Sequence, residues 1–193
     1  MTSGVRAAAG ASCPATPPEA QGAGVRDDGS VALKDMQVRV ERRFPQPSGL
    51  VWQLLTDVER MAGLGPEHTQ ARWVDAERGT GARFVGTNNR GGRLWEVDCQ
   101  VLSWRSPNAF AWVVGPADCP TATWRYALIP HEAGCLVVQT FRHGPGHSLL
   151  RAALQNRPEQ AERLVAARVA ELRTNMTVVL AEAEQLLSLG WHP

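Results

Sequence analysis

Apolar and polar residues alternate along most of the chain between residues 36 and 143. In the stretch RLWEVDCQVLSW (93–104), one side of the alternation is apolar and carries Trp95, Val97, Cys99 and Val101. Because successive side chains of a strand point to opposite faces, this period of two predicts a half-buried β-strand. Leu102 and Trp104 then follow out of phase, which predicts a bulge or a bend near residue 101.

Six further segments show a strand-like pattern. They are MQVRVERRF (36–44), QARWVDAE (70–77), ARFVGTNN (82–89), NAFAWVVG (108–115), TATWRYALIP (121–130) and CLVVQTFR (135–142). Glycine and proline lie between consecutive segments from residue 70 onward, as short connections between antiparallel strands require. The chain is therefore expected to form seven antiparallel strands.

Two short helices are expected after the first strand. Ser48 can cap a helix over LVWQLLTD (50–57), and Asp57 can cap a second one over VERMAG (58–63). A further short helix, SLLRAALQ (148–155), is expected within a loop over residues 143–157.

The C-terminal segment has a helical period. Apolar residues recur there at steps of four and three, which predicts a helix from Pro158 to Leu187 that is roughly 45 Å long. The apolar stripe consists of Val165, Val169, Leu172, Met176, Val179, Ala183 and Leu186. Charged residues lie off the stripe and are expected to face solvent, namely Arg163, Glu171, Arg173, Glu182 and Glu184. Gly190 is expected to end the helix.

Residues 1–35 lack this patterning. They are rich in Ala, Gly, Pro, Ser and Thr and contain almost no large apolar side chains, so they cannot bury enough surface to offset the entropy of ordering. We expect a flexible tail over 1–35 and one domain over 36–190. The tail has no apolar core of the kind a signal peptide needs, so a cytoplasmic location is expected.

Composition excludes several function classes. The net charge of +1 gives none of the positive field that nucleic acid or an anionic membrane would require, so neither is an expected partner. Lys34 is the single lysine and lies outside any phosphate-loop motif, which argues against Schiff-base enzymes and P-loop NTPases. The four cysteines show no CxxC spacing and are expected to be reduced thiols.

The order of these elements resembles the START/polyketide-cyclase superfamily, also called SRPBCC. The resemblance covers residues 36–187 and depends on VWQLLTDVER (51–60), RLWEVDCQVLSW (93–104), FAWVVG (110–115) and TWRYALIP (123–130). It implies an α+β helix-grip fold, in which a seven-stranded curved antiparallel sheet wraps around the long C-terminal helix. The space between sheet and helix is often a hydrophobic cavity in that superfamily, whose members include carriers, cyclases, aromatases and resistance proteins.

Large apolar side chains share the inward phase of the predicted sheet and helix. The expected substrate-binding residues are Trp95, Val97, Cys99, Phe110, Trp112, Trp124, Phe141, Leu172, Met176 and Val179. The alternative is that these side chains form a filled core. So many aromatic rings on one phase favour a cavity for a planar or polyene-like ligand, because ligand pockets are mostly apolar.

Few polar groups share that phase. Tyr126, Gln139 and His143 are the candidate catalytic residues, because a hydroxyl, an amide or a histidine near the rim can polarise a carbonyl or move a proton. The alternative for Tyr126 and Gln139 is a hydrogen bond to the neighbouring backbone, and the alternative for His143 is a solvated loop histidine. The resemblance also makes His68 a candidate, because it lies near where the cavity of the superfamily usually opens, and Asn88 is a candidate on the face of Phe84. The HxxxH spacing of His143 and His147 does not predict a metal site, because the intervening Gly-Pro-Gly excludes the helix that such a pair needs.

The function expected from the resemblance is a cyclase-type enzyme of secondary metabolism, of the kind used in antibiotic biosynthesis, that folds a polyketide-like substrate without a cofactor. The alternative is a non-catalytic carrier, sensor or self-resistance protein that binds the same class of hydrophobic molecule. A co-chaperone-like module would instead have a filled interior. The expected assembly is a monomer or homodimer.

Overall fold

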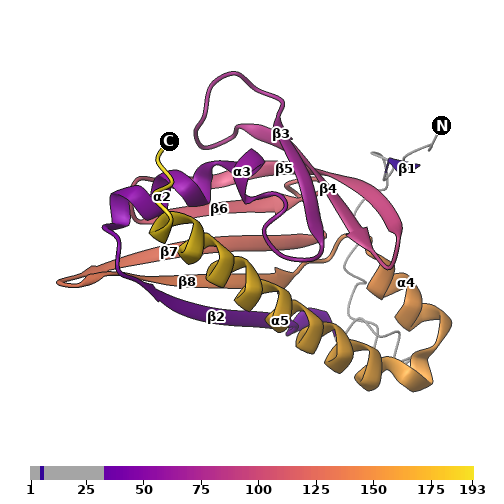
Figure 1. Ribbon diagram of the computed structural model, residues 1–193. Helices are drawn as coiled ribbons and strands as arrows, with labels where there is room; N and C mark the ends of the chain where they lie inside the picture. Colours follow the sequence, from indigo (N-terminus) through magenta and orange to yellow (C-terminus); the bar gives the residue numbers. More distant parts are fainter. Residues whose placement is uncertain (1–4, 7–32) are drawn as a thin grey trace, which may run out of the picture.

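The computed structural model describes residues 5–6 and 33–193 of the chain. A curved antiparallel sheet packs against the long helix α5, which crosses its concave face (Figure 1). The elements after the tail are β2 (Gln37–Phe44), α2 (Ser48–Thr56), α3 (Val58–Met61), β3 (His68–Trp73), β4 (Arg83–Arg90), β5 (Arg93–Arg105), β6 (Ala109–Val114), β7 (Ala122–His131), β8 (Gly134–His143), α4 (Leu149–Asn156), a 3₁₀ turn (Pro158–Gln160) and α5 (Ala161–Ser188). The predicted α+β helix-grip fold is confirmed.

The seven strands follow the order β2-β8-β7-β6-β5-β4-β3 across the sheet. The first and last of these strands in the sequence, β2 and β8, are neighbours, with Val38 opposite Phe141. A two-residue strand, β1 (Val5–Arg6), also pairs with β5, in parallel orientation. The rest of the predicted tail up to residue 32 lies outside the described residues, and Leu33 is already buried in the core.

The irregularity in β5 is a shift of register against β6 between Val101 and Ser103. This agrees with the change of phase in the sequence, and it puts Val101 and Trp104 against the core, whereas Leu102 is exposed. The long strand can thereby bend while it keeps an apolar face inward.

The helix ends agree with the sequence in part. The side chain of Asp57 caps α3 by accepting a hydrogen bond of 3.0 Å from the backbone N–H of Arg60. Ser48 does not cap α2: Pro47 occupies that position and Ser48 already belongs to the helix. The fixed φ of Pro47, at −59°, suits the helix entrance without a side-chain cap. Gly190 has a positive φ of 88° just after α5, as expected.

The buried face of α5 differs from the predicted stripe. The fully buried residues are Leu172, Met176, Leu180, Ala183 and Leu187, whereas Val165, Val169, Val179 and Leu186 are half-buried. A strict step of four and three repeats every 3.5 residues, but an α-helix turns once every 3.6 residues. Over 28 residues the buried line therefore drifts, and it reaches Leu180 and Leu187 instead of Leu186.

Three glutamates on α5 that were expected to face solvent are half-buried and paired. Glu182 accepts a hydrogen bond from the backbone N–H of Gly65 at 2.7 Å, and Glu184 forms an ion pair with Arg42 at 2.6 Å. Glu171 pairs with two arginines at the cavity, as described below. The expectation is wrong for these residues because the loop before β3 and strand β2 lie along the flanks of the helix; Arg163 and Arg173 are exposed as expected.

The cysteines are not all reduced. Cys99 and Cys135 are free and buried, but Cys119 is disulfide-bonded, so the expectation of four thiols is wrong at that position. Among the described residues, no helix is both long enough and apolar enough to cross a membrane.

Substitution of Leu180 tests how strongly the C-terminal half of α5 packs against the sheet, because the Leu180 side chain is only 1% exposed. We expect Leu180→Ala to lower the free energy of unfolding by about 2–5 kcal/mol. Leu189→Ala is the matched control, since Leu189 is 77% exposed and its truncation should cost less than about 0.5 kcal/mol. Urea unfolding measures both values, and similar small losses in the two variants would contradict the packing described here.

Candidate functional site

A cavity of about 610 Å³ lies between the concave face of the sheet and the helices α4 and α5. All thirteen residues predicted for the site line it: Trp95, Val97, Cys99, Phe110, Trp112, Trp124, Tyr126, Gln139, Phe141, His143, Leu172, Met176 and Val179. The inward phase predicted for β8, which carries Gln139 and Phe141, is therefore correct. The space is large enough for a small organic ligand.

Aromatic rings form one wall of the cavity across β6, β7 and β8. Trp112 and Trp124 are directly opposite in register and stack with an interplanar angle of 9° and centroids 6.2 Å apart. Trp112 also stacks on Phe110 at 4.9 Å, and Phe141 meets the edge of Trp124 at 4.9 Å. The two tryptophans are half-buried and line the cavity, so they offer flat apolar surface to a ligand.

Other aromatic rings pack together in a filled core, which is the arrangement that the alternative to a cavity predicted. Trp52 on α2 meets Trp104 edge-on at 5.6 Å, and Trp104 meets Phe110 at 5.4 Å. Trp73 packs on Trp104 at 6.1 Å. Of these four residues, only Phe110 lines the cavity, so the packed cluster closes one end of it.

Tyr126 and Gln139 form a polar pair in this apolar wall. They are opposite each other on β7 and β8, and Nε2 of Gln139 donates a hydrogen bond of 3.3 Å to the hydroxyl of Tyr126. Each residue is only 4% exposed, and burial raises the pKa of Tyr126, so its hydroxyl is neutral. Oε1 of Gln139 has no hydrogen-bond partner among the described residues.

His143 lies at the cavity wall with both ring nitrogens engaged. Its Nδ1 is 2.8 Å from the carbonyl oxygen of Gly144, and its Nε2 is 3.0 Å from Oγ of Ser148. A carbonyl only accepts, so Nδ1 carries the proton and Nε2 accepts from the hydroxyl. Burial lowers the pKa of His143, and the charge of Arg151 lowers it further, although the carbonyl of Gly144 opposes this shift. The imidazole therefore holds the loop before α4.

His68 has a buried ring nitrogen, Nε2, without a hydrogen-bond partner among the described residues. It begins β3 opposite Asn88 and lines the cavity. Burial lowers the pKa of His68 and outweighs the backbone of Gln70 and the carboxylate of Glu67, which both raise it. Gly86 makes room for the ring, because a Cβ there would lie 3.0 Å from Nε2.

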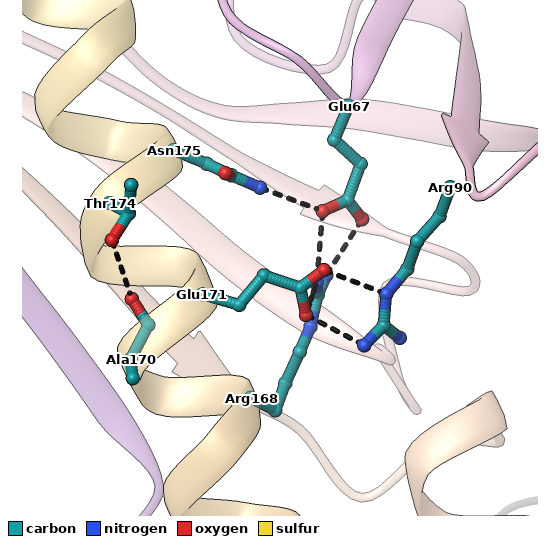
Figure 2. Close-up of polar contacts among 7 residues, drawn as sticks. All are labelled: Glu67, Arg90, Arg168, Ala170, Glu171, Thr174 and Asn175. Atoms are coloured by element: carbon teal, nitrogen blue, oxygen red, sulfur yellow. Dashed lines mark hydrogen bonds and ion pairs between the residues drawn. The ribbon is translucent and has the colours of Figure 1, made fainter.

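A polar network ties α5 to the sheet beside the cavity (Figure 2). Arg168 forms a bidentate ion pair with Glu67, with N–O distances of 2.7 and 2.8 Å, and also contacts Glu171 at 2.9 Å. Asn175 donates to Glu67 at 3.1 Å, and Arg90 at the end of β4 pairs with Glu171 at 2.7 Å. Burial opposes charge on Glu171, but the two arginines together lower its pKa.

The sequence interpretation missed this network, although a signal for it exists. Arg168, Asn175 and Glu182 recur every seven residues, so they share one side of the helix, and Arg168 and Asn175 flank Leu172 at i−4 and i+3. Their partners Glu67 and Gly65 lie in the loop before β3. A polar row beside an apolar stripe indicates partners on a neighbouring segment.

The remaining candidates have other roles. Cys99 contributes apolar wall, because burial raises the pKa of its thiol far above neutrality, and nearby Asp98 adds to this shift. Asp98 is exposed, and neither Glu96 nor Asp98 lines the cavity. Within the described part of the chain, no cluster of three histidine, cysteine or acidic side chains can hold a metal ion.

Comparison with models of protein families tests the family relationship that the order of strands and helices implied. The model of the family described as polyketide cyclase/dehydrase and lipid transport matches residues 35–177, more than half of the chain. The chain belongs to this family. The match includes the cavity wall from β3 to β8 and the N-terminal half of α5 up to Met176.

Solved structures share the polyketide cyclase/dehydrase fold at low sequence identity. A Thermus thermophilus protein has a TM-score of 0.58 and 18% identity over 80% of this chain and 99% of its own. A Nitrosomonas europaea protein gives 0.57 and 18% over 80% and 95%, and a polyketide-cyclase-like protein from Corynebacterium glutamicum gives 0.54 and 20% over 81% and 98%. These likenesses show the fold alone. A comparison with curated proteins finds no match.

The half-buried histidines His68 and His143 give stability a pH dependence. The pKa values of His68 and His143 lie below 6.5 in the folded chain, so below that pH the unfolded chain binds more protons than the folded one. The free energy of unfolding should therefore fall between about pH 7.5 and about pH 5.5. Urea unfolding at both pH values measures this loss. His68→Gln should reduce the loss and the exposed His131→Gln should not; an unchanged loss in His68→Gln would contradict a neutral buried imidazole.

Proposed function

We propose that this protein is a cyclase-type enzyme of secondary metabolism that acts on a hydrophobic, polyketide-like substrate held in the cavity. The observation that carries the proposal is the presence of two buried polar atoms without a partner among the described residues, Nε2 of His68 and Oε1 of Gln139, in the wall of the cavity. Buried polar atoms are normally hydrogen-bonded, so these two atoms support a ligand with polar groups at two places.

The two polar positions of the cavity wall are His68 and the Tyr126–Gln139 pair, and they act on different parts of the substrate. His68 is on β3 and Tyr126 is on β7, and three strands lie between them in the sheet. At about 4.8 Å per strand spacing, they are separated by about 19 Å along the sheet, and by less across its concave face. A chain with several carbonyl groups can reach both points at once, whereas a compact molecule with one polar group cannot.

In the proposed reaction, Nε2 of His68 takes a proton from a substrate carbon that lies between two carbonyl groups. The resulting enolate carbon attacks another carbonyl carbon of the same chain, which forms one C–C bond and converts that carbonyl oxygen to an alkoxide. The alkoxide then takes the proton back from His68. Substrate and product are isomers, so the step needs no cofactor, and the lowered pKa of His68 keeps the base unprotonated at neutral pH.

Confinement of the substrate chain in the cavity supplies the rest of the rate enhancement. The rings of Trp112 and Trp124 offer flat surface against which a flexible chain can fold, and the Tyr126–Gln139 pair fixes one carbonyl. Orientation of two reacting groups in a near-attack geometry can remove several kcal/mol from a barrier. His143 acts as a positioning residue that keeps the loop before α4 in place. The protein is proposed to work as a monomer or homodimer.

The second candidate function is a non-catalytic carrier, sensor or self-resistance protein for the same class of molecule. Two observations favour it: both nitrogens of His143 are engaged, and burial raises the pKa of Tyr126, so neither residue exchanges protons readily near neutral pH. Catalysis therefore depends on His68.

Turnover of a linear poly-β-ketone thioester separates the two functions. We expect His68→Gln to reduce the rate of cyclised product by about 10²-fold or more, because a general base contributes about 10²–10⁴ in rate. Tyr126→Phe should change the ratio of ring products, since one end of the chain is no longer fixed. Liquid chromatography with mass spectrometry measures both effects.

The exposed His131→Gln is the control and should behave like the unsubstituted protein. Product formation at the same rate and in the same ratio in all variants would contradict the proposed enzymatic function. The carrier function would then remain.

A further inference from the structure

The Tyr126–Gln139 pair is isolated in apolar surroundings. In the sheet, Gln139 lies between Tyr126 on β7 and Val40 on β2, and its inward neighbours along β8 are Val137 and Phe141. All of these are buried, and no ion pair of the described residues involves them. Neighbouring side chains therefore offer the pair neither further hydrogen bonds nor a charge.

After its internal bond, the pair still offers both an acceptor and donors to a ligand, and the second N–H of Gln139 is among the donors. The internal bond uses one N–H of Gln139 and a lone pair of the Tyr126 oxygen. Oε1 of Gln139 then remains as an acceptor, and the O–H of Tyr126 remains as a donor that is free to point into the cavity. A donor and an acceptor thus lie side by side on the wall.

This complementarity does not depend on the orientation of the amide. If the amide turns by 180°, Oε1 accepts the proton of Tyr126, and the pair then presents an N–H of Gln139 and a lone pair of Tyr126. At least one donor and one acceptor lie side by side in both arrangements.

We propose that the Tyr126–Gln139 pair recognises an uncharged ligand group that carries one donor and one acceptor next to each other, such as a primary amide, a protonated carboxyl group or an enol. This inference rests on the proposed function, because it names the substrate group that the cavity selects. A ketone or ester satisfies only half of the pair. An ionised carboxylate loses its hydration at the pair without gaining a cation there, since the neighbouring side chains in the sheet carry no charge.

Four naphthalene probes of similar size test the inference by isothermal titration calorimetry: 2-naphthamide, 2-acetonaphthone, 2-naphthoate and naphthalene. We expect 2-naphthamide to bind about tenfold more tightly than 2-acetonaphthone, because the ketone leaves one buried polar atom of the pair unpartnered. The anion 2-naphthoate should bind more weakly than 2-naphthamide by a similar factor or more. Gln139→Leu should remove the preference for the amide over the ketone.

Gln185→Leu is the matched control, because Gln185 is an exposed amide on α5 that does not line the cavity. It should keep the tenfold preference, and circular dichroism checks that both variants are folded. Equal affinity of the unsubstituted protein for the amide and the ketone would overturn the inference and leave the proposed function standing. Failure of all four probes to bind would overturn both. The comparison of probes in the unsubstituted protein decides the inference even if Gln139→Leu does not fold.

Discussion

The structure depends on the way α5 is held against the concave face of the sheet. The C-terminal half of the helix packs tightly, since Leu180, Ala183 and Leu187 are buried and do not line the cavity. The N-terminal half stands over the cavity, with Leu172 and Met176 facing it. There the bidentate ion pair of Arg168 with Glu67, in the loop before β3, adds to the contacts of the buried Leu172 and Met176 (Figure 2). One end of α5 therefore gives stability, and the other end leaves space.

This division explains how the fold can keep an interior space without collapse. An apolar void costs free energy because the atoms around it lose contacts. The stacked rings of Phe110, Trp112 and Trp124 brace the wall of the sheet, and the polar network fixes the distance of the helix from β3 and β4. The cavity is thereby retained, and its unpartnered polar atoms are positions where the proposed ligand would bind. The proposed function and the proposed recognition of a paired donor and acceptor both follow from this arrangement.

The fold was largely predictable from the sequence because each strand carries its own alternation, and turn residues mark the connections. The inward phase of Trp95, Trp124 and Phe141 followed from the same period of two, which is why the predicted residues all reach the cavity. The drift of the buried line to Leu180 was not predictable from a fixed step of four and three. Pairing partners distant in sequence, such as Glu67 and Arg168, were also missed, because their contact is set by how the loop before β3 crosses the helix. His68 was noticed, but only the folded chain shows that its Nε2 is buried without a partner among the described residues, whereas both ring nitrogens of His143 are engaged.

The most direct test of the central claim is a crystal structure of the protein with N-phenyl-1-naphthylamine, a neutral probe with flat aromatic groups. The account predicts density for the probe inside the domain, against the rings of Trp112 and Trp124 and opposite Met176 on α5. Tryptophan rings packed directly onto Met176, with the probe absent from the interior or bound only at the surface, would contradict it.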